Sequence, residues 1–144
     1  MIRDFIDVNS LSARVLTFNS ETDFEGALRK ANLSKSCAAK TNVFTDERKF
    51  FLVVVSSLGE KVSLEEVASL VKTKVFEIEE AEVLLLSGFE KKYFPPMGVF
   101  GAKIFFHPSV ARRKTLVFRL GLMEYLVISK DDIIKSSELG GSLV

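Results

Sequence analysis

The amino-acid sequence predicts a mixed α/β domain in which helices flank a mixed, partly antiparallel β-sheet. Its length of 144 residues is typical of one domain, so we expect a single domain over 1–144. Stretches with strand character outnumber those with helical spacing and cluster towards the end of the chain, which favours a mixed sheet. The apolar run at 50–55 shows no alternation of apolar and polar residues, which predicts a strand covered on both faces.

The first half of the chain contains three predicted helices and three predicted strands. Ser63 with Glu66 has the spacing of a capping box, in which each residue satisfies a backbone N–H group at a helix start. In chain order we expect a short appended helix within 1–14 (its spacing reaches from 2 to 13), a strand at 15–18, a helix capped by Ser20 or Thr22 that runs to Ala31, strands at 37–44 and 50–55, and a helix at 63–71.

The second half is richer in strands. A proline has no N–H group and a fixed φ, so Pro95 and Pro96 predict an irregular loop at 90–101. Around this loop we expect a strand at 75–78, a helix at 79–86 that ends just before Gly88, strands at 103–106, 115–119 and 125–128, a short last helix opening at Ser129, and a frayed tail at 136–144.

Composition excludes several classes of protein. The net charge is +1, from 20 basic and 19 acidic residues, so any contact with RNA must come from a local patch. The single cysteine and the lack of a charged start followed by an apolar run predict a reducing compartment, and we expect a cytoplasmic protein with no membrane segment. Only His107 and Cys37 offer typical zinc ligands, too few for a catalytic zinc, so we expect no metal.

Lys40 is an unusual residue for its context. It lies between the apolar stretches 37–39 and 43–44, and lysine is seldom buried in a strand without a role. A partly desolvated ammonium group interacts strongly with phosphate or carbonyl oxygen. The alternative, a lysine at a sheet edge whose stem extends to water, remains open.

The stretch from Ser87 to Gly98 is the second unusual feature. Glycines at 88 and 98 frame a rigid Pro-Pro corner, an arrangement that holds backbone N–H groups at fixed positions. Acyl transfer needs such donors to bind a carbonyl or its oxyanion. An ordinary surface loop would have the same composition, so this alternative also stays open.

Together these two stretches resemble the YbaK/prolyl-tRNA editing family of aminoacyl-tRNA deacylases. The segment 38–44, Ala-Ala-Lys-Thr-Asn-Val-Phe, is similar to a family segment (I/V)-x-K-(S/T)-L-(V/L)-F, with Asn42 in place of the usual aliphatic residue. The segment 87–98, Ser-Gly-Phe-Glu-Lys-Lys-Tyr-Phe-Pro-Pro-Met-Gly, is similar without a gap to the family loop T-G-(Y/F)-x-x-G-x-V-x-P-F-G. The likeness extends over about 15–134.

The resemblance implies an enzyme that hydrolyses the ester bond of a mischarged tRNA in trans, without metal or organic cofactor. Its partners would be the aminoacylated 3′ end of a tRNA and an aminoacyl-tRNA synthetase. It implies catalytic roles for Lys40, Gly88 and Gly98 and substrate-binding roles for Thr41, Phe89, Pro96, Met97 and His107. Four basic residues are candidates for tRNA contacts through phosphate, with a solvated charged face as the open alternative: Lys91, Lys92, Arg112 and Arg113.

Three positions differ from the family pattern. Lys92 stands where the family has a glycine in the loop, His107 stands where it has an aspartate, and only Gly121 remains of a glycine-rich turn. These differences motivate a second hypothesis, a relative that binds tRNA or a synthetase without hydrolysis. A third is an interaction domain whose pocket is filled by some of the 13 phenylalanines.

Overall fold

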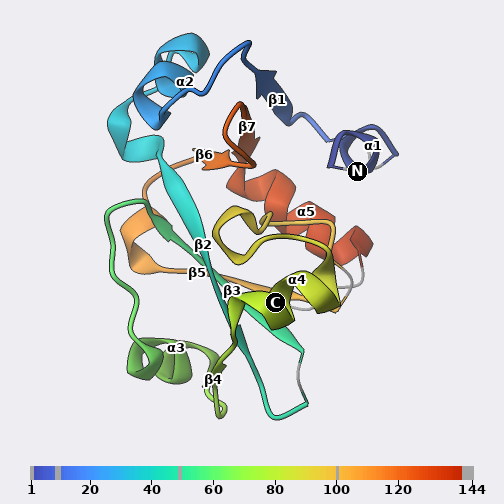
Figure 1. Ribbon diagram of the computed structural model, residues 1–144. Coiled ribbons are helices and arrows are strands. Elements are labelled where there is room, and N and C mark those ends of the chain that lie inside the picture. The colour runs from blue at the N-terminus through green and yellow to red at the C-terminus, as the bar shows by residue number, and fades with distance from the viewer. Residues whose placement is uncertain (1, 9–10, 49, 100, 141–144) are drawn as a thin grey trace.

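Two β-sheets, joined by a parallel bridge, form the framework of the protein (Figure 1). The structure is a computed structural model that describes residues 2–8, 11–48, 50–99 and 101–140. The strands are β1 (Arg14–Thr17), β2 (Ala39–Thr45), β3 (Phe51–Ser57), β4 (Phe76–Glu77), β5 (Lys103–Phe106), β6 (Thr115–Arg119) and β7 (Glu124–Ser129). The helices are α1 (Ile2–Val8), α2 (Phe24–Ala31), α3 (Leu64–Val71), α4 (Glu80–Ser87) and α5 (Lys130–Gly140), with 3₁₀ turns η1 (Lys35–Cys37), η2 (Lys91–Tyr93) and η3 (Pro108–Val110).

The smaller sheet has the order β1-β7-β6 and is antiparallel throughout. The larger has the order β4-β2-β3-β5, in which β3 and β5 run parallel and the other pairs antiparallel. The bridge between Ala38 and Val117 connects them. The predicted fold class, a mixed α/β domain with partly antiparallel pairing, is therefore confirmed, although the strands divide into two sheets.

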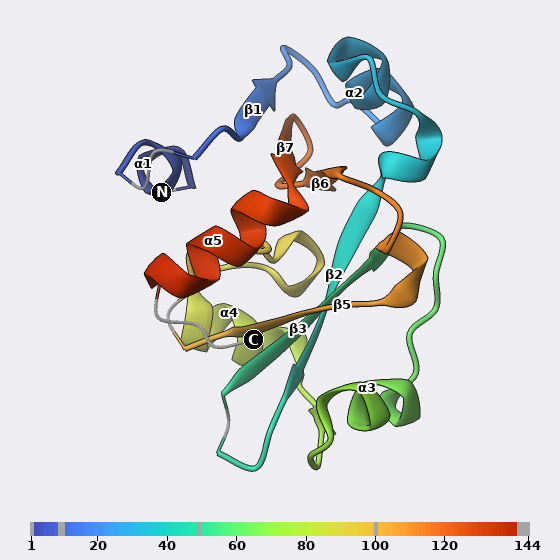
Figure 2. The same cartoon turned by 180° about the vertical axis from the view of Figure 1, so that it is seen from behind.

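The larger sheet is covered on both faces, as the unbroken apolar run predicts. Phe51, Val53 and Val55 of β3 pack into the main core with side chains from α4 and α5. The alternate residues Leu52 and Val54 pack on the opposite face against α3. Figures 1 and 2 show α3 on one side of this sheet, and α4 with the long loop that follows it on the other.

The smaller sheet carries α2 and a fully buried tyrosine. Tyr125 of β7 packs edge-on against Phe18 and Phe24, with ring centroids 6.1 Å and 5.1 Å away. Its hydroxyl donates a hydrogen bond to the Thr22 carbonyl (2.5 Å). Burial raises the pKa of Tyr125 above its ordinary value of 10.0, and the positive charge of Arg119 opposes this shift.

Replacing Tyr125 with phenylalanine should change how stability depends on alkaline pH. Above pH 10 the unfolded tyrosine loses its proton while the folded one keeps it, so unfolding releases a proton and a rise in pH favours unfolding. The contribution of Tyr125 is therefore complete below pH 10 and declines above it. Near pH 8 the Tyr125→Phe variant should lose about 0.5–1.5 kcal/mol for the missing hydrogen bond. Urea unfolding at pH 8 and at pH 11 measures the difference, and a difference that does not shrink at pH 11 contradicts the prediction.

Several predicted helix boundaries are corrected by the structure. The first helix ends at Val8, and residues 11–13 have no regular structure, whereas the spacing predicted a helix to 13. Asp23 caps α2, accepting a hydrogen bond from the Gly26 N–H (2.9 Å) in place of Ser20 or Thr22. Ser63 caps α3 as predicted, through a bond from the Glu66 N–H (3.1 Å).

The last helix is longer than predicted. It reaches Gly140, and Ser136, which the sequence placed in a frayed tail, is buried with its hydroxyl on the Ile133 carbonyl (2.7 Å). Positions 141–144 of the predicted tail lie outside the described residues. No helix in the described part of the chain combines the length and apolar character needed to cross a lipid bilayer.

Candidate functional site

Lys40 and the loop that follows α4 meet at one pocket. The pocket has a volume of about 190 Å³ and lies where the start of β2, in the larger sheet, meets β6 of the smaller sheet. Its lining comes from α2, β2, the turn after β3, η2 and β6: Phe24, Ala39, Lys40, Thr41, Leu58, Lys92, Tyr93, Phe94, Phe118 and Arg119. The two features that the sequence singled out are thus adjacent in space.

The geometry of β2 explains how the pocket forms. The Leu58 N–H donates to the Ala38 carbonyl (2.9 Å), and the register pairs Lys40 with Ser56. Backbone groups alternate along an antiparallel strand, so those of Lys40 face β3 and those of Thr41 point to the opposite edge. Among the described residues no strand pairs with this edge between the bridge at Ala38 and β4, which begins its pairing at Phe44. The loop after α4 covers the edge instead.

The adjacent side chains of Lys40 and Thr41 lie on opposite faces of β2 and differ in their contacts. The Thr41 hydroxyl donates to the Phe94 carbonyl (2.7 Å) and so fastens the loop to the strand. Lys40 is half-buried, and within the described residues its ammonium group has no hydrogen bond or ion pair. Its positive charge is therefore available to a ligand at the pocket.

The loop contributes different residues to the pocket from those expected. Gly88 ends α4 with φ +80°, and its N–H donates to the Leu84 carbonyl (2.8 Å), so this N–H is already used by the helix end. Pro96 and Met97 are buried, and Gly98 lies against the Phe5 ring of α1. None of these four lines the pocket. The lining residues of the loop belong to η2 and its end, a short turn that the sequence did not predict.

Phe89 faces a second hollow of similar size. This hollow of about 220 Å³ lies on the other side of Tyr93, against α1 and β1. Phe89 also packs against Phe94, with the ring centroids 6.1 Å apart. Its position supports the wall of the Lys40 pocket from behind.

The four basic residues expected to bind tRNA differ in their surroundings. Lys91 donates to the Ile78 carbonyl through Nζ (2.8 Å) and so has a structural contact. Lys92 is exposed, with Nζ 5.1 Å from the Tyr93 ring centroid, at the rim of the pocket. Arg112 is exposed and Arg113 half-buried, both after η3.

Arg119 is a pocket residue that sequence reasoning missed. Its Nε donates to the Gly121 carbonyl (2.9 Å), its Nη2 lies 3.8 Å from a Glu21 carboxylate oxygen, and its guanidinium group stacks over Tyr125 at 5.5 Å. Like Lys40, Arg119 is a charged residue beside an apolar stretch of a strand, here residues 116–118 of β6. These contacts hold the guanidinium group in a fixed position at the pocket.

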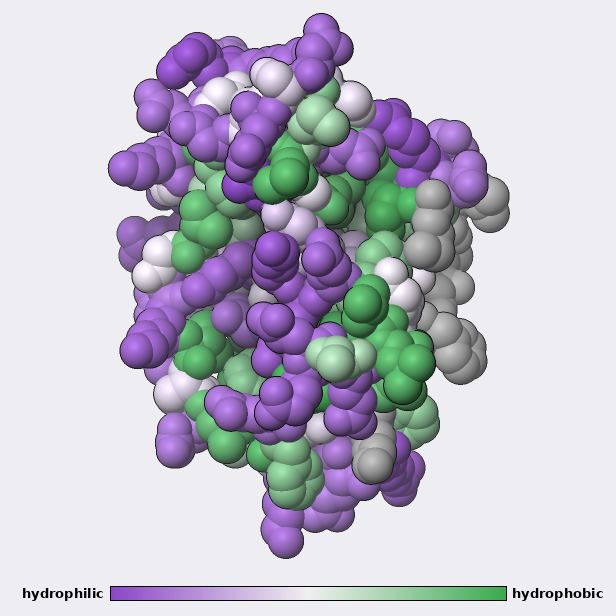
Figure 3. Space-filling model, viewed as in Figure 1, coloured by the Kyte–Doolittle hydropathy of each residue, from purple (hydrophilic) through white to green (hydrophobic). Residues whose placement is uncertain are grey.

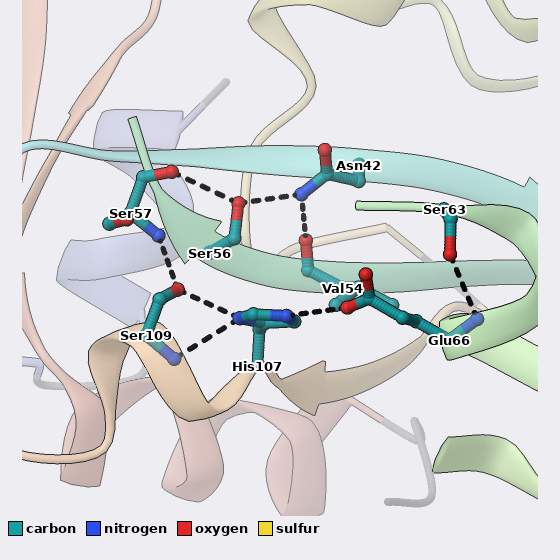
Figure 4. A network of polar contacts seen from close by, with 8 residues as sticks. All are labelled: Asn42, Val54, Ser56, Ser57, Ser63, Glu66, His107 and Ser109. Atoms are coloured by element: carbon teal, nitrogen blue, oxygen red, sulfur yellow. Dashed lines mark hydrogen bonds and ion pairs between the residues drawn. The ribbon is translucent and has the colours of Figure 1, made fainter. Parts of the chain in front are cut away.

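His107 belongs to a separate network, which Figure 4 shows. Its Nδ1 accepts a hydrogen bond from the Ser109 N–H (3.1 Å) and lies 2.9 Å from the Ser109 hydroxyl. Its Nε2 lies 2.9 Å from a Glu66 carboxylate oxygen. Since Nδ1 accepts a backbone hydrogen bond, Nε2 carries the proton and donates a hydrogen bond to the Glu66 carboxylate. His107 therefore caps η3 and joins it to α3, and it does not line the Lys40 pocket.

The same network continues towards β2. The Ser109 hydroxyl accepts from the Ser57 N–H (3.0 Å), and the neighbouring Ser56 hydroxyl accepts from the Asn42 amide (2.9 Å). The Asn42 amide also donates to the Val54 carbonyl (2.8 Å). The polar residue that replaces an aliphatic one in β2 thus has its hydrogen-bond partners inside the sheet.

A groove of about 660 Å³ lies beside His107, between that residue and α3. Ser109, His107 and Glu66 are the residue types of a hydrolytic triad, in hydrogen-bonded order. Ser109 does not line the groove, however, and its hydroxyl already serves the cap of η3 and the end of β3. Within the described residues no three His, Cys, Asp or Glu side chains gather in a way that could hold a metal ion.

Comparison with known proteins gives a family and a fold. A model of the aminoacyl-tRNA editing domain matches residues 19–135. Among solved structures, the hypothetical protein APE2540 superposes with a TM-score of 0.76 at 19% identity, over 99% of this chain and 95% of that one. A candidate trans-editing enzyme for prolyl-tRNA synthetase gives 0.73 at 16%, over 99% and 91%. A scaffold protein used for computational epitope backbone grafting gives 0.76 at 15%, also over 99% and 91%. A search of curated protein sequences finds no significant match.

Proposed function

Because the chain belongs to the aminoacyl-tRNA editing domain family, we propose that it is a trans-acting deacylase that hydrolyses the ester bond of mischarged tRNA. The observation that carries this proposal is the pocket in which Lys40 meets residues 92–94 of the loop. The pocket is small, partly apolar and bordered by three cationic side chains, Lys40, Lys92 and Arg119. A space of this kind suits the aminoacylated 3′ end of a tRNA, and we propose the cytoplasm as the location of the reaction.

Lys40 is the residue that we assign to the chemistry. In ester hydrolysis a water molecule, assisted by the neighbouring ribose 2′-hydroxyl, attacks the carbonyl carbon, and negative charge develops on the carbonyl oxygen. The bond to the ribose oxygen then breaks, which releases the free amino acid and the tRNA hydroxyl. A fixed positive group beside that oxygen lowers the barrier. The Lys40 ammonium, which has no partner among the described residues, supplies this charge either to the carbonyl or to the terminal phosphate. Thr41 acts indirectly, because it holds the loop at Phe94.

The tRNA body would contact exposed basic residues near the pocket. Lys92 lies at the rim, and Arg112 and Arg113 follow η3. Lys91, bound to the Ile78 carbonyl, contributes less. Since the net charge is only +1, binding rests on a few phosphate contacts and should weaken moderately with salt.

The proposal is tested by incubating the protein with a panel of mischarged and correctly charged tRNAs. We expect at least one mischarged tRNA to lose its amino acid more than tenfold faster than it does spontaneously, and correctly charged tRNAs to be spared. If every ester decays at the spontaneous rate, the deacylase assignment fails.

One observation favours a second function, tRNA binding without hydrolysis. Lys92 occupies the middle position of the loop, where the family pattern has glycine, and it presents an exposed cation at the pocket rim. A filter-binding assay with the same tRNAs separates the two functions. Salt-sensitive binding together with uncleaved ester supports the second function, whereas ester cleavage supports the first.

A further inference from the structure

Helix α4 carries apolar side chains on its solvent-facing side. Leu84, Leu85 and Leu86 are 50%, 83% and 54% exposed, and Val83 is the buried residue of this helix. Figure 3 shows hydrophobic side chains gathered on the surface over α4. A surface helix normally presents polar residues to water, and exposed apolar patches are typical of interaction sites.

The positions around the helix axis define the shape of this surface. Successive residues are about 100° apart, so Ala81, Leu84 and Leu85 form a continuous stripe opposite Val83. We call these three residues the α4 stripe. Glu80 borders the stripe on one side and Glu82 on the other, and both are exposed. Glu77 and Glu79 add further negative charge before the helix, and no lysine or arginine occurs between 75 and 90.

The acidic residues beside the α4 stripe indicate which kind of partner can bind there. Glu80 and Glu82 repel phosphate groups, which excludes the RNA backbone from this surface. A symmetric dimer places the same patch against itself, so a second copy would bring these glutamates face to face. A protein segment with apolar residues flanked by lysine or arginine satisfies both the stripe and its acidic borders.

We propose that the α4 stripe is the docking surface for a partner protein, which binds through an amphipathic helix carrying basic residues beside its apolar face. The surface lies next to the proposed catalytic loop, since α4 ends at Gly88 and Lys91 is bonded to Ile78 just before the helix. None of the stripe residues lines the Lys40 pocket. The proposal therefore does not depend on whether the pocket hydrolyses esters.

The test uses the full chain and two labelled synthetic peptides of the same composition. One has leucines at positions i, i+3, i+4 and i+7 flanked by lysines, and the other has the same residues in scrambled order. Fluorescence anisotropy should show the patterned peptide binding at least tenfold more tightly than the scrambled one, and more weakly as salt is raised. Leu85→Lys should reduce this binding at least tenfold. Leu122→Lys, at an exposed leucine (52%) on the turn between β6 and β7, is the matched control and should bind as the wild type does.

Three results would overturn the proposal. Equal affinity for the patterned and scrambled peptides would show nonspecific attraction only, and an equal loss in the Leu122→Lys control would show that the position on α4 is irrelevant. A wild-type dimer in sedimentation that Leu85→Lys dissociates would identify a second copy as the occupant. Deacylation by Leu85→Lys, measured without peptide, should match the wild type, so a failed docking test and a failed deacylase assignment are distinguishable.

Discussion

Replacing Lys40 with alanine should lower kcat/KM for deacylation of the preferred mischarged tRNA by about 100-fold or more. Removal of one group that stabilises the developing oxyanion has an effect of this size. The ammonium has no partner among the described residues, so its loss should leave the free energy of unfolding almost unchanged. Single-turnover hydrolysis and urea unfolding of the two proteins measure both quantities.

A second lysine variant separates catalysis from general attraction of tRNA. Lys30 is an exposed residue of α2 whose Nζ lies 5.1 Å from the Phe18 ring centroid, away from the Lys40 pocket. Lys30→Ala should retain kcat/KM within about threefold, because one surface charge contributes little. Wild-type kcat/KM in Lys40→Ala, or an equal loss in both variants, would contradict the assigned role.

Replacing Phe94 with alanine should destabilise the protein by about 3–5 kcal/mol, the usual range for removing a buried aromatic ring. Phe94 is 2% exposed and packs against Phe51, with ring centroids 5.3 Å apart, and against Phe89. It also forms part of the wall of the Lys40 pocket. We therefore expect both a lower urea midpoint and a loss of deacylation, even under conditions where the variant remains folded.

Phe76 provides the matched control for this change. It lies in β4 and is 48% exposed, so Phe76→Ala should shift the free energy of unfolding by about 0.5 kcal/mol or less and leave deacylation intact. Similar losses in the two variants would show that Phe94 has no special place in the core.

Local signals in the sequence were reliable where a single interaction decides the outcome. The unbroken apolar run predicted that β3 is covered on both faces, and Ser63 predicted the start of α3. The sequence also singled out Lys40 and the loop at 87–98 as unusual, and the structure places residues 92–94 beside Lys40. Each of these inferences rests on the residue types within one short segment and needs no knowledge of tertiary contacts.

Features set by long-range packing were not predictable in this way. The division into two sheets depends on where Ala38 meets Val117, and no local pattern encodes that pairing. The 3₁₀ turns are too short to have a period, and η3 depends on the partners of His107 in α3 and of Ser109 in β3. For the same reason Arg119 and Phe118, almost 80 residues from Lys40 in the sequence, entered the site only with the tertiary structure.

The attachment of the loop to β2 has a consequence for solubility as well as for the site. An uncovered strand edge exposes backbone donors and acceptors that another chain can pair with, a common route to aggregation. Between Ala38 and Phe44 the outer edge of β2 has the loop as its cover, fastened by the bond from Thr41 to Phe94. Changes in the loop that alter substrate choice must therefore preserve this cover. A change of specificity in this loop is therefore limited by the need to prevent edge-to-edge pairing of β2 with a strand of another chain.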